Sequence, residues 1–316
     1  MISYIDGING RLFYRGYPIS TLVENSSFEE VSYLLIYGKL PSKSELQEHK
    51  DLLVKERNIP DNILSILKSF PRNTTRIELL RTAVSALSLY DPDDYIYTED
   101  ANIRKGLRIM AKMPTIIAFS HQIQTNQPLV EPSEDFSHAG NYYYMMTGEK
   151  PSEEFESAFD QVLICHADHS INASTMSCRV TVSTLSDLYS GITSAIGTLR
   201  GPLHGGANEA VIKYMFNEVK RKKNVLPWVK KKLANKEKIM GFGHRVYKTW
   251  DPRAVIMRDM AFKFWDKYKN GESIDRIDCG RAIDHDHEEV DYILEMTEIL
   301  KDYMIEEKGI NPNVDL

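Results

Sequence analysis

The sequence has few cysteines, and their spacing does not form a recognisable site. Cys165, Cys178 and Cys279 are the three cysteines among 316 residues, and no Cys-x-x-Cys pair occurs. An odd number of widely separated cysteines argues against a disulfide framework and against a zinc site. This usage is typical of a protein from a reducing compartment, and we expect a cytoplasmic location.

Long apolar runs are absent as well. No stretch of about 20 apolar residues occurs, which argues against a membrane-spanning helix. Residues 1–10 lack the basic start and the sustained apolar region of a targeting signal. We therefore expect a protein that acts away from membranes and carries no presequence.

An excess of positive charge is missing too. Lys and Arg total 39 against 45 Asp and Glu, a net charge of −6, which argues against general binding of nucleic acid. The exception is the stretch 220–238, with nine basic residues and one Glu. We interpret it first as a solvated helical surface, although such a field near a cleft would attract a polyphosphate ligand.

Strand patterns are few, and the predicted fold class is mainly α with a short N-terminal β-hairpin. Asn9-Gly10 between apolar runs predicts the hairpin, with residues 11–14 as its second strand. Pro114 is expected to kink or divide the helix that contains it. Apolar periodicity predicts helices at about 44–57, 61–69, 76–89, 101–122, 153–168, 173–197, 209–222, 226–234, 253–268 and 287–308.

The change in pattern after Asn208 predicts two domains, a large helical domain over 1–208 and a smaller one over 209–316. A cleft between two such domains is where a small-molecule site is expected. The stretch 173–197 is rich in small residues, which favours close helix packing inside one subunit or a contact between subunits.

Two histidines lie in glycine-rich turns. Residues 201–208 read Gly-Pro-Leu-His-Gly-Gly-Ala-Asn and contain His204, and residues 241–245 read Gly-Phe-Gly-His-Arg and contain His244. Glycines allow the backbone to approach a ligand, and helix N-termini favour negative charge. Taken alone, His204 is better explained by a role in holding its own turn, and the Gly-x-Gly before His244 is a weak signal.

Two further histidine pairs raise the possibility of metal binding. His166 and His169 stand three residues apart near a helix end, without a third nitrogen or thiolate nearby. We interpret His166 as structural and His169 as a ligand-binding candidate. His285 and His287 lie in an acidic tract that is better explained as the start of a surface helix. We therefore predict no metal site.

Seven segments, taken together, resemble the citrate synthases and occur in the order of that family. The resemblance covers nearly the whole chain. The segments are residues 6–19, 37–41, 141–151, 166–174, 201–208, 241–253 and 309–315.

The resemblance implies Claisen condensation of acetyl-CoA with oxaloacetate and hydrolysis of the thioester, in a homodimer without metal or other cofactor, the coenzyme A (CoA) thioester being a substrate. By this resemblance the catalytic residues are His204, His244 and Asp315. His169 and Arg253 match oxaloacetate-binding positions. The positions that match the CoA site are Ile239, Met240, Gly241, Phe242, Gly243 and Lys248.

The family continues past its aspartate into a segment with two further arginines for the oxaloacetate carboxylates, one of them acting on the partner subunit. The present sequence ends at Leu316, so we expect weaker oxaloacetate binding and interpret the chain as an incomplete enzyme. A charge-assisted hydrogen bond of this kind is worth about 1.5–3 kcal/mol. The alternatives are a 2-methylcitrate synthase that uses propionyl-CoA and an inactive remnant that binds CoA.

Overall fold

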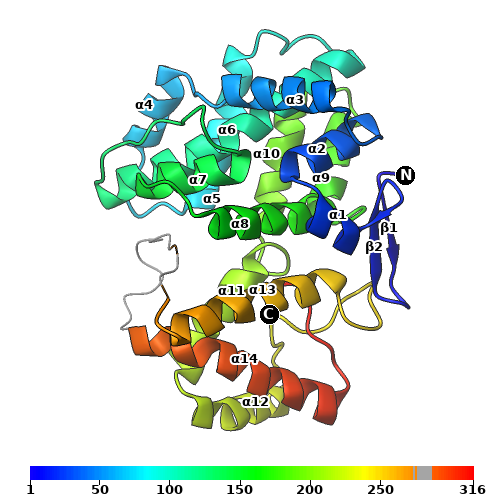
Figure 1. Ribbon diagram of the computed structural model, residues 1–316, viewed down its shortest axis with the longest axis vertical. Helices are drawn as coiled ribbons and strands as arrows, with labels where there is room; N and C mark the ends of the chain where they lie inside the picture. The colour runs from blue at the N-terminus through cyan, green and yellow to red at the C-terminus, as the bar shows by residue number, and fades with distance from the viewer. Residues whose placement is uncertain (273–274, 276–286) are drawn as a thin grey trace. The chain divides into compact units, whose positions relative to one another are not determined.

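The computed structural model describes residues 1–272, 275 and 287–316, and Figure 1 shows that helices dominate it. The described residues contain one small sheet of three antiparallel strands in the order β1-β2-β3. The predicted mainly α class is confirmed. Among the helices described, none combines the length and the apolar character needed to cross a bilayer.

The predicted hairpin is present. β1 (Ser3–Asp6) pairs with β2 (Arg11–Tyr14), which pairs in turn with β3 (Tyr17–Pro18). Gly10 adopts φ +64°, a value that favours glycine. The side chain of Asp6 accepts hydrogen bonds from the side-chain amide of Asn9 at 2.7 Å and from its backbone N–H at 3.0 Å, which close the turn and lower the pKa of Asp6.

The remaining elements are helical. The first part of the chain contains α1 (Ile19–Asn25), α2 (Phe28–Tyr37), α3 (Lys43–Lys55), α4 (Asp61–Ser69), α5 (Arg76–Leu87), a 3-10 turn (Ser88–Tyr90), α6 (Glu99–Thr125), α7 (His138–Thr147), α8 (Glu153–His166), α9 (Ala173–Val182) and α10 (Leu188–Leu199). The later part contains α11 (Gly206–Tyr214), a π-helical turn (Met215–Val219), a 3-10 turn (Lys222–Asn224), α12 (Val225–Ala234), α13 (Pro252–Lys269) and α14 (His287–Lys308).

Several boundaries follow from local side-chain chemistry. Ser42 and Glu45 form the predicted capping box at the start of α3, and Gly38 ends α2 with φ +84°. Two predictions need correction. Of the two effects expected of Pro114, division of the helix is wrong, because α6 runs through the buried proline, and the kink stays a prediction. The stretch 173–197 is two helices, because Leu185 takes φ +63° and Asp187 caps α10.

The described residues group into two compact units, which differ from the predicted domains. The first unit contains 1–2, 21–200 and 275, and the second contains 3–20, 201–272 and 287–316. The grouping changes after residue 200, and the division into domains after Asn208 stays a prediction. The hairpin groups with the second unit because Gly7 and Gly10 pack against residues 246–250.

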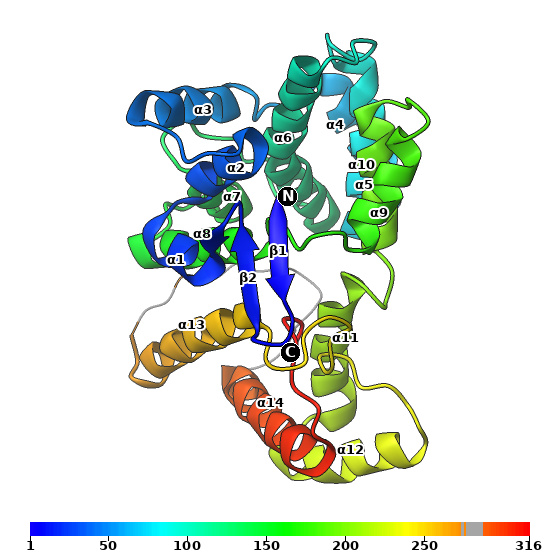
Figure 2. The ribbon, with the colours of Figure 1, turned by 90° about the vertical axis from the view of Figure 1, so that its right-hand side faces the viewer.

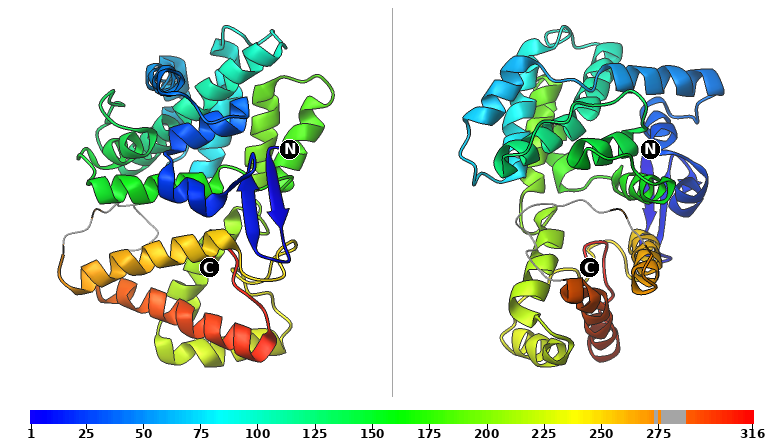
Figure 3. Two further views of the ribbon diagram at one scale, coloured as in Figure 1. Left: turned by 45° about the vertical axis from the view of Figure 1, so that its right-hand side comes forward. Right: turned by 60° about the vertical axis from the view of Figure 1, so that its left-hand side comes forward.

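Each unit has its own apolar core. In the first, α4, α5, α6 and α10 contribute buried residues such as Leu67, Val84, Ile116 and Ile196, and Figure 2 shows α5, α9 and α10 side by side. In the second, the core residues come from α11, the π-helical turn, α12, the loop at 239–242 and α14. Figure 3 shows α13 alongside α14, where Arg258 and Glu298 form a bidentate ion pair.

Candidate active site

His244 lies in a turn whose backbone determines its tautomer. The preceding Gly243 has φ +72°, and the His244 ring is partly buried. Its Nδ1 accepts the backbone N–H groups of Val246 at 3.0 Å and Tyr247 at 3.1 Å. A backbone N–H can only donate, so Nδ1 carries no proton in this arrangement and Nε2 is the N–H donor of a neutral ring. Burial lowers the pKa of His244; the charge of Asp251 opposes this shift and that of Arg253 adds to it.

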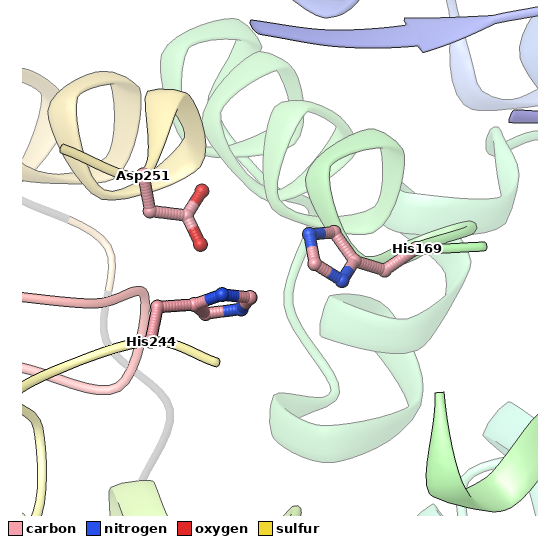
Figure 4. Close-up of side chains that lie close together, drawn as sticks. All are labelled: His169, His244 and Asp251. Carbon is pink, nitrogen blue, oxygen red and sulfur yellow. The ribbon is translucent and has the colours of Figure 1, made fainter. Parts of the chain in front are cut away.

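Asp251 and Arg253 form a buried ion pair beside this ring. Oδ1 of Asp251 accepts Nε–H of Arg253 at 3.0 Å, and Oδ2 accepts Nη2–H at 2.7 Å. The Asp251 side chain is 0% exposed and that of Arg253 is 8% exposed. Burial alone would lower the pKa of Arg253, but the hydrogen bonds and charge of Asp251 raise it. Figure 4 draws the Asp251 carboxylate next to the His244 ring, and a carboxylate oxygen lies within 4.8 Å of a ring nitrogen.

Sequence reasoning identified Arg253 and missed Asp251. A signal was present: Asp251 precedes Pro252, the first residue of α13, and proline is favoured at that helix position with an aspartate before it. The Asp251 carbonyl accepts the Ala254 N–H at 3.1 Å, and Oδ1 accepts the Arg253 N–H at 2.9 Å. The capping geometry therefore places the carboxylate against the Arg253 side chain.

The turn that precedes His244 is paired with the segment that contains Asp315. Gly243 N–H donates to Asn311 O at 2.9 Å, and Asn313 N–H donates to Gly241 O at 3.0 Å. The Asp315 N–H donates to the Asn313 side chain at 2.9 Å. Gly241 has φ +88°, and an added Cβ would stand 3.2 Å from the Leu316 Cα, so the close approach depends on glycine.

The same turn contacts α11, the helix that follows His204. The Tyr214 hydroxyl donates to Met240 O at 3.1 Å, and an added Cβ on Gly241 would lie 3.1 Å from Val211 Cγ2. His204 itself lies two residues before α11, where its N–H donates to Gly201 O at 2.9 Å. The second unit thus holds together the segments bearing His204, residues 239–244 and Asp315.

Comparisons with known proteins agree with the resemblance read from the sequence. A family model described as citrate synthase, C-terminal domain, matches residues 1–316. The chain is 44% identical over 309 residues to citrate synthase 2 of Bacillus subtilis, covering 98% of this chain and 77% of that protein. The chain belongs to the citrate synthase family.

A solved structure confirms the citrate synthase fold. The citrate synthase of Thermoplasma acidophilum, in a ternary complex with carboxymethyl coenzyme A and oxaloacetate, matches with a TM-score of 0.88 and 34% identity. The match covers 99% of this chain and 78% of that one. Relatives named 2-methylcitrate synthase also match this chain. A 2-methylcitrate synthase of Mycobacterium tuberculosis is 43% identical over 249 residues, which cover 78% of this chain and 62% of that protein.

Among the residues that match citrate synthase positions, His169 lies in the first unit and the others lie in the second. His169 belongs to the loop between α8 and α9, and the next residue, Ser170, has φ +59°. A positive φ at a residue other than glycine is a strained conformation of the kind found at functional sites. His166 is exposed at the end of α8, where its Nδ1 lies 2.8 Å from Val162 O, in agreement with a structural role.

The other residues singled out in the sequence lie at the surface or outside the residues that the structure describes. Lys248 is exposed, and its backbone N–H donates to Gly7 O at 2.7 Å. Within 220–238, Lys232 pairs with Glu218 and Glu237. The other exposed cations of this stretch are Lys220, Arg221, Lys223, Lys230, Lys231, Lys236 and Lys238. His285 and Cys279 lie outside the described residues, and His287 is described as the first residue of α14 only.

Proposed function

We propose that this chain condenses acetyl-CoA with oxaloacetate and hydrolyses the product thioester to citrate and CoA. The observation that carries the proposal is the His244 ring. Its Nδ1 is held by two backbone N–H groups, which makes Nε2 a hydrogen-bond donor, and the charge of the buried Arg253 guanidinium acts on this ring. Oxaloacetate has a ketone oxygen, which accepts a hydrogen bond, and carboxylates, which attract a cation. A neutral donor together with a cation suits both kinds of group.

The first step is removal of a methyl proton from acetyl-CoA, and the proposed base is Asp315. The methyl group of a thioester is far less acidic than a carboxylic acid, so the carboxylate needs help. In the proposed step, His204 donates a hydrogen bond to the thioester oxygen as the enolate forms. One such donor is commonly worth about 3–4 kcal/mol in the transition state.

The second step joins the enolate carbon to the ketone carbon of oxaloacetate. The electron pair of the carbonyl moves to its oxygen, and the proposed role of His244 Nε2–H is to stabilise that developing alkoxide. Arg253 and His169 are the proposed ligands of the oxaloacetate carboxylates. Arginine suits this task because its planar fork matches a carboxylate bidentately. Water then cleaves the thioester of the condensed product and releases CoA.

The proposed CoA site consists of residues 239–243, where the glycine turn admits a close approach, together with Lys248. The exposed cations of 220–238 favour an anionic ligand in the second unit through their combined field. No step is assigned to a metal or another cofactor. The alternative of a metal held by His166 and His169, or by His285 and His287, is tested by metal analysis of protein purified without a tag.

We also propose a homodimer. Support comes from the family resemblance and from the apolar surface of α9, where Met176 and Val180 are 54% and 56% exposed, with Leu185 after it 85% exposed. Sedimentation equilibrium gives the test. A mass twice that of one chain supports the dimer, and a mass of one chain contradicts it.

The test of the proposed function is release of CoA thiol from acetyl-CoA on addition of oxaloacetate, with Asp315→Asn as the matched variant. We expect turnover that the variant lowers by about 100- to 10,000-fold, the usual contribution of a general base. Turnover that persists in the variant would remove Asp315 from the base role. Calorimetric binding of CoA without any turnover would support the inactive CoA-binding protein instead.

The second candidate is 2-methylcitrate synthase, favoured by the Mycobacterium tuberculosis relative. It uses the same residues with propionyl-CoA. Comparison of kcat/KM for acetyl-CoA and propionyl-CoA under the same conditions decides between the two. One extra methylene changes such a ratio by about 10- to 200-fold, which is large enough to measure.

A further inference from the structure

The proposed chemistry leaves one buried carboxylate of the second unit without a role. The Asp251 side chain is 0% exposed, and its two oxygens accept the backbone N–H, Nε–H and Nη2–H of Arg253. A carboxylate withdrawn from water in this way persists as a charge only when it is paired and hydrogen-bonded. Its partner is the arginine proposed to bind oxaloacetate.

The geometry of the pair divides the guanidinium into two edges. Asp251 occupies the side edge, formed by Nε–H and one Nη2–H. A planar guanidinium has a second fork, formed by its two terminal nitrogens, that a carboxylate can also bind with two parallel hydrogen bonds. The pair with Asp251 holds the plane of the guanidinium and therefore fixes the direction of this second fork.

The charge of Asp251 taken alone would weaken oxaloacetate binding, whereas its anchoring of Arg253 would strengthen it. A carboxylate oxygen of Asp251 lies within 4.8 Å of one His244 ring nitrogen, so its negative charge is close to the proposed substrate position and repels a dianion. Positioning predicts that loss of the charge weakens oxaloacetate binding, whereas simple repulsion predicts that it strengthens binding. The sign of the change separates the two roles.

We propose that Asp251 is the positioning residue for oxaloacetate recognition, acting by anchoring Arg253 so that its terminal fork meets a substrate carboxylate. This inference rests on the proposed function and adds to it a residue outside the set that matches the family's site positions. Asp251 takes no proton from the substrate and makes no contact with it.

The first test is Asp251→Asn, which keeps the volume and removes the charge. We expect the KM and calorimetric Kd for oxaloacetate to rise by tenfold to a hundredfold, on the order usual for a group that orients a binding side chain. The KM for acetyl-CoA stays unchanged. The matched control is Asp259→Asn, which removes a 69% exposed carboxylate from α13, the helix that follows Asp251. A Kd for oxaloacetate that falls or stays constant in Asp251→Asn would overturn the proposal.

A double-mutant cycle with Arg253→Gln tests whether Asp251 acts through Arg253. We expect Asp251→Asn to have no further effect on oxaloacetate affinity when residue 253 is already Gln. Independent, additive losses would overturn the proposal. The double variant replaces the ion pair by two neutral amides. It therefore contains no buried unpaired charge, and thermal unfolding of all four proteins shows that the cycle compares folded chains.

A measurement without substrate separates this proposal from the proposed function. In nitrogen-15 NMR spectra, the Nε–H signal of Arg253 is expected to be sharp in the wild-type chain and broadened by solvent exchange in Asp251→Asn. A wild-type chain that binds no oxaloacetate would overturn the proposed function, and the Arg253 signal would still decide whether Asp251 anchors the guanidinium. An unchanged signal in Asp251→Asn would overturn the anchor.

Discussion

At the scale of single residues, backbone groups determine what the His244 side chain can do. A histidine in water exchanges its proton between two nitrogens, and either tautomer is available. Here the N–H groups of Val246 and Tyr247 both point at Nδ1, which leaves the proton on Nε2. The same contacts oppose a charged ring because both nitrogens of an imidazolium are donors.

The first residue-scale prediction concerns this tautomer. We expect nitrogen-15 NMR spectra at neutral pH to show Nδ1 of His244 unprotonated and Nε2 protonated, with His244→Gln used to assign the signals. The titration midpoint should lie below that of a free histidine, because burial lowers the pKa of His244. A ring protonated at both nitrogens at pH 7 contradicts the prediction.

At the scale of elements, the N-terminal hairpin supports the loop that bears the site residues. Lys248 N–H donates to Gly7 O at 2.7 Å. A Cβ on Gly7 would stand 2.3 Å from Val246 O, and a Cβ on Gly10 would stand 2.8 Å from Trp250 O. Because Gly7 and Gly10 have no Cβ, they leave room for the backbone between His244 and Asp251.

A second prediction follows from this packing. Gly7→Ala should displace residues 246–248, destabilise the fold by about 1–3 kcal/mol, the usual cost of overpacking, and lower kcat/KM for oxaloacetate. The control is Ile8→Ala, which changes a neighbouring side chain that is 79% exposed. Kinetic assays and thermal unfolding measure both effects. Equal kinetics for the two variants would show that the hairpin does not influence the loop.

At the scale of the whole molecule, stability depends on buried ionisable groups of the first unit. Both carboxylate oxygens of Asp160 on α8 accept the N–H of Phe28, at 3.1 and 2.9 Å, at the start of α2. Burial and the nearby charges of Glu29 and Glu156 raise the pKa of Asp160 to about 7, opposed by Lys50. His138 is also buried, and burial lowers its pKa to about 4.

These two shifts affect stability with opposite signs. The Asp160 contribution is complete below an unfolded pKa near 3.8 and is lost as pH rises through about 7. The His138 contribution is present above an unfolded pKa near 6.5 and is lost as pH falls through about 4. Between pH 4 and pH 7 the two contributions change the free energy of unfolding in opposite directions as pH rises. Each unit of difference between the folded and unfolded pKa is worth about 1.4 kcal/mol of that free energy.

A third prediction isolates the Asp160 contribution. The Tm of Asp160→Asn should be closest to that of the wild type near pH 4, where Asp160 is protonated in the folded chain and partly protonated in the unfolded chain. It should exceed the wild-type Tm by a growing amount at pH 5 and pH 8. Thermal unfolding at these pH values gives the measurement, with Glu153→Gln, exposed on the same helix, as the control. A Tm difference that does not grow with pH contradicts the raised pKa of Asp160.

Much of the fold was predictable because its rules act over a few residues. Asn9-Gly10 predicted the hairpin, and Ser42 with Glu45 predicted the start of α3. The break inside 173–197 was missed because apolar periodicity continues across it, although Asp187 offered a capping signal. Pro114 was expected to kink or divide a helix, and it does not divide α6, because packing around a buried helix outweighs the loss of one backbone hydrogen bond.

By itself, the sequence determined the mainly α class, the short elements bounded by glycine and capping residues, and the family. Tertiary structure alone decided which distant segments meet, such as residues 241–243 with 311–313. It also decided the tautomer of His244, the burial of Asp251 and the grouping of the hairpin with the second unit. The physical reason is range: caps and turns act within about four residues, whereas hydrogen bonds and burial between distant segments depend on how the whole chain packs.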